Sequence, residues 1–112
     1  MELLRSCGLP VWVMEPLRGG KLAVLSGEAM ERLNQFRPEE KAPAWAFRFL
    51  QSVPGVTMIL SGMSDFRQLQ ENIHTFEEDN PLQKEEMDTV LAIADEMLKK
   101  SALPCTACRY CV

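Results

Sequence analysis

Residues 54–64 read PGVTMILSGMS and combine a turn, an apolar run and a loop in that order. Pro54 and Gly55 break regular structure, so they end whatever precedes them. Residues 56–60 are apolar without polar alternation, which is typical of a strand covered on both faces in a parallel sheet. Residues 10–14, PVWVM, form a second run of this kind. The two runs predict two short parallel strands.

Helical patterns surround these strands. Residues 1–8 resemble the end of a helix closed by Gly8, and a weaker helix is predicted over about 28–36, ended by Pro38. The next helix opens at residues 42–43, with proline near its first position. We expect its buried face to consist of Ala46, Phe49, Leu50 and Val53.

Two further helices follow the second strand. Apolar residues recur at helical spacing after residue 64, at Phe66, Leu69, Ile73 and Phe76. Asn80-Pro81 supplies a start signal for the last helix. The apolar stripe of that helix consists of Met87, Val90, Leu91, Ala94, Met97 and Leu98.

Strands that alternate with helices indicate βα units around a parallel sheet, and therefore an α/β fold. Two parallel strands do not make a stable sheet on their own, however. The chain also begins in the middle of a helix. We therefore expect it to be a piece of a larger α/β protein, with about two strands and a mostly helical remainder.

Composition excludes several classes of protein. The 112 residues are 46% hydrophobic and 25% charged, with a net charge of −4, as in ordinary globular proteins. Nucleic-acid partners are not expected, because such proteins usually carry a positive face. The sequence has no run of about 18 apolar residues and no signal-peptide layout, so we expect a cytoplasmic protein without a membrane partner.

Two glycine-containing loops follow the predicted strands, where βα proteins place their ligands. Residues 18–21, RGGK, combine close backbone approach with two cations. Residues 61–64, SGMS, lead into a helix whose N-terminus favours an anion. Together the loops could hold a pyrophosphate. The alternative, that the glycines only permit tight turns, stays open because such short motifs are weakly specific.

Three of the four cysteines lie near the end of the chain. Cys105, Cys108 and Cys111 have the spacing of the first three ligands in a bacterial ferredoxin run, which binds a [4Fe–4S] cluster. A zinc site usually draws on two separated pairs, and a disulfide framework usually accompanies secretion. The fourth cysteine of the run would fall beyond Val112. We predict an incomplete iron–sulfur motif, with incidental thiols as the alternative.

Other candidates for chemistry are weak. His74 is the only histidine and lies on a predicted helix between apolar residues. No pair of a nucleophile and a base stands out, and no carboxylate pair does. The sequence therefore predicts no catalytic residue.

Several segments resemble one known family. Residues 13–22, VMEPLRGGKL, resemble the seventh strand and following loop of the aldo/keto reductases. Residues 42–50 and 54–64 resemble the seventh helix and eighth strand of that family, and residues 68–72, QLQEN, resemble the helix that ends its cofactor site. The resemblance covers about residues 9–100. The cysteines narrow it to members with a C-terminal ferredoxin-type segment.

The resemblance implies a (β/α)8 TIM barrel that binds NAD(P)H across its C-terminal face. Residues 1–100 would be the C-terminal part of the barrel, with strands seven and eight, and residues 101–112 would begin a truncated [4Fe–4S] motif. Position by position, it implies a cofactor site made of Met14, Leu17, Gly19, Gly62, Met63, Ser64, Asp65, Gln68, Glu71 and Asn72.

Within this set, the resemblance assigns each residue a place along the dinucleotide. Met14 would pack against the nicotinamide, where many members have an aromatic ring, and Leu17 and Gly19 would follow the pyrophosphate. Residues 62–65 would surround the adenosine phosphate, and residues 71–72 would reach the adenine. Gln68 stands where the family has an arginine for the 2′-phosphate, so NADH and NADPH both stay open.

The family's catalytic Asp, Tyr, Lys and His come from earlier strands, so the resemblance implies none in this chain. The parent would be an oxidoreductase that moves a hydride between the cofactor and a small carbonyl or alcohol substrate, with an electron-transfer partner for the cluster. The chain alone would be inactive. One alternative is a small helical iron–sulfur or metal-binding electron-transfer module. Another is a fragment that self-associates through exposed strand edges.

Overall fold

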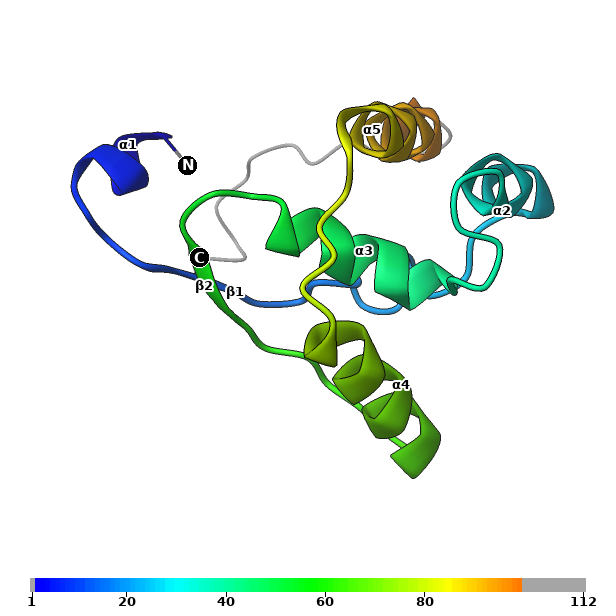
Figure 1. Cartoon of the computed structure of the whole chain (residues 1–112), viewed down its shortest axis with the longest axis horizontal. Coiled ribbons are helices and arrows are strands. Elements are labelled where there is room, and N and C mark those ends of the chain that lie inside the picture. The colour runs from blue at the N-terminus through cyan, green and yellow to red at the C-terminus, as the bar shows by residue number, and fades with distance from the viewer. Residues whose placement is uncertain (1, 100–112) are drawn as a thin grey trace.

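The computed structural model describes residues 2–99, which form two strands and five helices in an α/β arrangement (Figure 1). The elements in chain order are α1 (Glu2–Ser6), β1 (Val11–Val13), α2 (Gly27–Asn34), α3 (Ala42–Gln51), β2 (Val56–Ile59), α4 (Phe66–Glu77) and α5 (Lys84–Lys99). Among these residues, no helix is long and apolar enough to cross a membrane.

The two strands pair in parallel, as predicted. Trp12 aligns with Met58 and Val13 with Ile59, and the register is irregular just before Trp12. The backbone N–H of Leu60 donates to the carbonyl of Val13 at 2.9 Å, which extends the pairing toward the loops. The strands are shorter than the apolar runs that predicted them, because Pro10, Met14 and Leu60 lie just outside them.

Only one face of this two-stranded sheet is covered by the described residues. Side chains alternate along a strand, so Val13 and Ile59 turn toward the helices and are half-buried, whereas Trp12 is 63% exposed and Met14 is 74% exposed. Met58 is exposed on β2 as well. The expectation of strands covered on both faces is therefore not met within residues 2–99.

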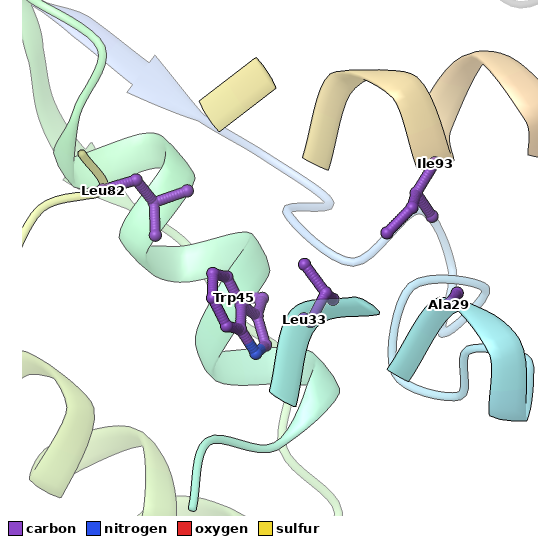
Figure 2. Packing of buried hydrophobic residues seen from close by; sticks show 5 residues of the cluster. All are labelled: Ala29, Leu33, Trp45, Leu82 and Ile93. Atoms are coloured by element: carbon purple, nitrogen blue, oxygen red, sulfur yellow. The ribbon is translucent and has the colours of Figure 1, made fainter. Parts of the chain in front are cut away.

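Helix α3 lies at the centre, between α5 and α4, and also contacts β2 (Figure 1). Figure 2 shows Trp45 of α3 beside Leu33 of α2, with Ile93 reaching in from α5. Ala29 and Leu82 complete this cluster. On another side of α3, Phe47 is fully buried and its ring lies 5.3 Å from that of Phe76 on α4.

The buried face of α3 differs from the predicted one. Its most buried residues are Ala42, Ala44, Trp45, Phe47 and Arg48. The predicted stripe is only half-buried, and three of its members, Ala46, Phe49 and Leu50, line an apolar hollow between α3, α5 and the segment after β1. The reason is that α3 packs against helices on two sides, so that no single stripe describes its burial.

The predicted apolar stripes on α4 and α5 are only partly covered within residues 2–99. On α4, Phe66 is 71% exposed, and Leu69, Ile73 and Phe76 are exposed too. Helix α5 begins at Lys84, a few residues after the start signal, and buries Ile93, which lay outside the predicted stripe. Leu91 and Leu98 are about half exposed. Within the described chain, these helices have neighbours on one side only.

Two arginines fasten the segment between α4 and α5 to the rest of the molecule, and we call their contacts the arginine clasp. Arg48 is 3% exposed and donates from Nε to Glu40 at 2.6 Å and from a terminal nitrogen to Glu78 at 3.2 Å. Arg37 donates twice to Glu86, at 2.5 and 2.7 Å. Both arginines also donate to the carbonyl of Asn80. The clasp positions the start of α5 against α3.

Candidate functional site

An open cleft of about 680 Å³ lies where the two strands end. The loops after β1 and β2 form two of its walls, and the N-terminal ends of α3 and α4 form the others. Clefts of this size commonly hold small organic ligands, and the carboxyl ends of parallel strands are where α/β proteins bind them. The cleft thus lies at the place that the two glycine-containing loops predicted.

The loop after β1 has an unusual backbone. Glu15 and Arg18 have positive φ angles of 50° and 49°, and Gly19 and Gly20 follow at 62° and 86°. A left-handed conformation costs a residue with a Cβ atom about 1–2 kcal/mol, and such strain clusters at ligand sites. The sequence predicted a loop here. It gave no local signal that Glu15, which lines the cleft, would adopt this conformation.

The loop after β2 is fixed by an interlocked cap on α4. The carboxylate of Asp65 accepts a hydrogen bond from the backbone N–H of Gln68 at 2.9 Å. The side-chain oxygen of Gln68 in turn accepts from the backbone N–H of Ser64 at 3.0 Å. Asp65 and Gln68 are therefore engaged in forming the start of the helix. The carboxylate of Asp65 also places a negative charge where an anion was expected to bind.

The structure brings most of the predicted cofactor residues together. Those that line the cleft are Leu17, Gly19, Gly62, Met63, Ser64, Gln68, Glu71 and Asn72. Asp65 caps α4 and is not among the lining residues. Met14 also lies outside the cleft, in a shallower depression that it shares with Leu60 and Gly62, because its side chain turns to the open face of the sheet.

The cleft also contains two cations, Lys41 and Arg67, that were not among the predicted cofactor residues. The Nζ of Lys41, at the N-terminus of α3, lies 2.5 Å from Oε1 of Glu71. The Nε of Arg67 on α4 lies 3.8 Å from the same oxygen. Lys41 and Glu71 are 30 residues apart in the chain, so local pattern could not reveal the pair.

The predicted metal ligands Cys105, Cys108 and Cys111 lie outside residues 2–99. Within those described residues, no group of three or more His, Cys, Asp or Glu side chains is placed to hold a metal ion. Cys7 is a free, exposed thiol, and His74 is exposed on α4. The iron–sulfur centre therefore stays a prediction.

Comparison with solved structures reveals the fold that this arrangement belongs to. The chain is similar to the aldo-keto reductase AKR11C1 from Bacillus halodurans in its apo form, with a TM-score of 0.63 and 19% sequence identity. The similarity covers 83% of this chain and 37% of that chain. No protein-family model matches, and no curated protein matches. The chain thus has the α/β fold of part of an aldo-keto reductase barrel and spans little more than a third of that neighbour's length.

Proposed function

We propose that the chain is the C-terminal part of an aldo/keto reductase-like oxidoreductase and that its cleft binds NAD(P)H. One observation carries the proposal: residues that the family resemblance assigns to the cofactor line a single cleft at the carboxyl ends of both strands. The fold similarity to an aldo-keto reductase also supports it. The cleft suits a dinucleotide because its glycines let a phosphate approach the backbone closely and because cations lie beside them.

The residues have distinct proposed roles. Gly19 and Gly20 let the first loop approach a pyrophosphate closely, since an added Cβ would be strained by their positive φ angles. Gly62 and Ser64 offer backbone and a hydroxyl to the adenosine phosphate. Asn72 would contact the adenine. Met14, at the adjoining depression, would pack against the nicotinamide ring when the barrel is complete.

The bound cofactor supplies the hydride, and this chain supplies the position from which it is delivered. In the proposal, the acid and base that act on the carbonyl or alcohol substrate come from other strands of the parent barrel. The 112-residue chain is therefore expected to bind the dinucleotide weakly and to catalyse no carbonyl reduction. Turnover of a carbonyl with NADH or NADPH by the pure chain would contradict this part of the proposal.

Replacing Gly62 with alanine tests the cleft. A Cβ at Gly62 would meet nothing within 4 Å, and Gly62 does not have a positive φ angle, so folding should be unaffected. We expect the Kd for NADH and for NADPH to rise about tenfold, as for the loss of one good phosphate contact. The measurement is the fluorescence change of the reduced cofactor titrated with the 112-residue chain.

Gly27→Ala is the matched control, because Gly27 also has open space around it and does not line the cleft. Urea unfolding of all three proteins shows whether their folding is equal. Two results would overturn the proposal: no cofactor binding by the original chain, or equal binding by Gly62→Ala, Gly27→Ala and the original chain.

The second part of the proposal concerns the cysteines near the C-terminus. We propose that Cys105, Cys108 and Cys111 ligate a [4Fe–4S] cluster that exchanges electrons with the cofactor or with an electron-transfer partner. Anaerobic reconstitution with iron and sulfide of the chain extended through the expected fourth cysteine should give broad visible absorption, and Cys108→Ser is expected to abolish it. Cys7→Ser is the control. Equal absorption in the two variants would contradict the assignment.

A further inference from the structure

One end of the cleft carries two cations that share a single carboxylate. Lys41 approaches Glu71 from the start of α3, and Arg67 approaches it from one turn earlier on α4. The amine of Lys41 lies at 2.5 Å and the guanidinium of Arg67 at 3.8 Å from the same oxygen of Glu71. The two cations and the one carboxylate therefore carry a net charge of +1.

The position of Lys41 adds to this surplus. Lys41 is the N-cap residue of α3 and makes no side-chain capping hydrogen bond. The N-terminal end of a helix carries partial positive charge, which disfavours a cation and favours an anion. Lys41 thus adds a full positive charge to an end of a helix that is already positive. An incoming anion would be attracted by both.

The ion pairs that now occupy these cations are easily replaced. The side chain of Lys41 is 64% exposed and that of Arg67 is 79% exposed. Exposed pairs of this kind contribute little to stability, whereas hydrogen bonds from cations to a phosphate dianion are among the strong ones. A phosphomonoester can therefore displace Glu71 from both cations without disturbing the fold.

Gln68 cannot make a charge-assisted contact with a phosphate. Its side-chain oxygen accepts from the backbone N–H of Ser64 at 3.0 Å, and an amide carries no charge to offset a phosphate. Yet Gln68 lies beside Arg67 and lines the same cleft as Lys41. The arginine that the family resemblance would place at position 68 is therefore absent, and two cations lie close by.

We propose that Lys41, with Arg67, binds the 2′-phosphate of NADPH in place of an arginine at position 68, so that the cleft prefers NADPH to NADH. The inference rests on the proposed function, because it assumes that the dinucleotide lies in this cleft. In the free chain, Glu71 holds the amine of Lys41 beside the site. When the phosphate binds, it takes the place of the Glu71 carboxylate.

The test compares the Kd of NADP⁺ with that of NAD⁺ by calorimetry, since the two differ only in the 2′-phosphate. The original 112-residue chain is expected to bind NADP⁺ about tenfold more tightly, as for one charge-assisted contact. Lys41→Gln is expected to remove that preference and to leave the Kd of NAD⁺ unchanged. Lys84→Gln is the charge-matched control, because Lys84 pairs with Asp88 on α5 and does not line the cleft.

The variant Glu71→Gln tests whether Glu71 competes with the phosphate for Lys41 and Arg67. Because Glu71 competes for the two cations, this variant is expected to raise the ratio of the Kd of NAD⁺ to the Kd of NADP⁺; a change in the contact with the adenine would affect both ligands alike and cancels in that ratio. The inference is overturned if Lys41→Gln keeps the preference, if it weakens both ligands equally, or if the original chain shows no preference. In those cases dinucleotide binding, and with it the proposed function, still stands. If neither dinucleotide binds, both proposals fail.

Discussion

Replacing Phe47 with alanine is expected to lower the free energy of unfolding by about 3–5 kcal/mol, the usual cost of truncating a buried aromatic side chain. Phe47 has no solvent exposure, and its ring packs at 5.3 Å and an interplanar angle of 54° against Phe76. Alanine would leave a cavity between α3 and α4. Since domains are stable by only about 5–15 kcal/mol, the variant would lie close to its unfolding threshold.

The same substitution should weaken dinucleotide binding, because the charged residues at one end of the cleft come from both α3 and α4. Lys41 begins α3, and Glu71 lies on α4 before Phe76. The ion pairs Lys41–Glu71 and Arg48–Glu78 also join these two helices, so loss of the aromatic contact is expected to loosen their spacing rather than to separate them. Urea unfolding followed by tryptophan fluorescence measures the stability, and cofactor titration measures the binding.

Phe66→Ala is the control for Phe47→Ala, since Phe66 is a phenylalanine at the start of α4 that is 71% exposed. We expect it to cost less than about 1 kcal/mol. The double variant of Phe47 and Phe76 should reveal a coupling of about 0.5–1.5 kcal/mol between the rings. A cost for Phe47→Ala as small as that of Phe66→Ala would refute the argument.

The features that the sequence predicted correctly depend on neighbouring residues in the chain. The apolar runs at 10–14 and 56–60 indicated parallel strands, and β1 and β2 form within them. Proline and glycine marked the loops and the ends of helices, because their effect on the backbone is also local. The glycine-containing segments after the strands then located the cleft, because parallel strands bring their carboxyl ends to one edge.

The features that the sequence could not predict depend on contacts between distant segments. The buried guanidinium of Arg48 on α3 finds its partners Glu40, Glu78 and the carbonyl of Asn80 on separate segments. Lys41 and Glu71 similarly meet across 30 residues. Helical spacing alone identifies an apolar stripe but not the neighbour that would cover it, and the predicted stripe on α4 is exposed within residues 2–99.

The exposed apolar residues fit the proposal that the chain belongs to a larger barrel. Trp12 and Met58 align on the open face of the sheet, and in a complete barrel this inner face is filled by side chains from the other strands. The apolar runs, which indicate strands covered on both faces, thus match strands in a complete barrel rather than in the isolated chain. Self-association of the isolated chain through this face stays a prediction, and light scattering would detect it.

Replacing Arg37 with alanine is expected to cost about 3 kcal/mol at neutral pH, because it leaves the buried carboxylate of Glu86 without its partner. Glu86 is 6% exposed and receives two hydrogen bonds from the guanidinium, at 2.5 and 2.7 Å. The same guanidinium lies 5.8 Å from the ring centre of Trp45 in the core. Its loss therefore affects both the start of α5 and the main hydrophobic cluster.

The pH dependence identifies the ion pair as the cause. The hydrogen bonds from Arg37 hold the pKa of Glu86 below its ordinary value, against the opposing effect of burial. A carboxyl whose pKa is lower in the folded than in the unfolded chain stabilises the fold above its unfolded pKa, and this stabilisation is lost as the pH falls through the folded pKa. The difference in stability between the original chain and Arg37→Ala should therefore be largest near pH 7. It should shrink below about pH 4.5, where the unfolded carboxyl takes up its proton.

Arg32→Ala provides the matched control, because Arg32 on α2 pairs with Glu96 on α5 at 2.9 Å, with side chains that are 33% and 50% exposed. Water already solvates both charges of that pair, so its removal should cost less than about 1 kcal/mol at any pH. Urea midpoints for the three proteins between pH 3 and pH 8 decide the matter. Equal costs for the two arginines, or a cost for Arg37→Ala that persists undiminished in acid, would mean that packing of the guanidinium, rather than its charge, stabilises the start of α5.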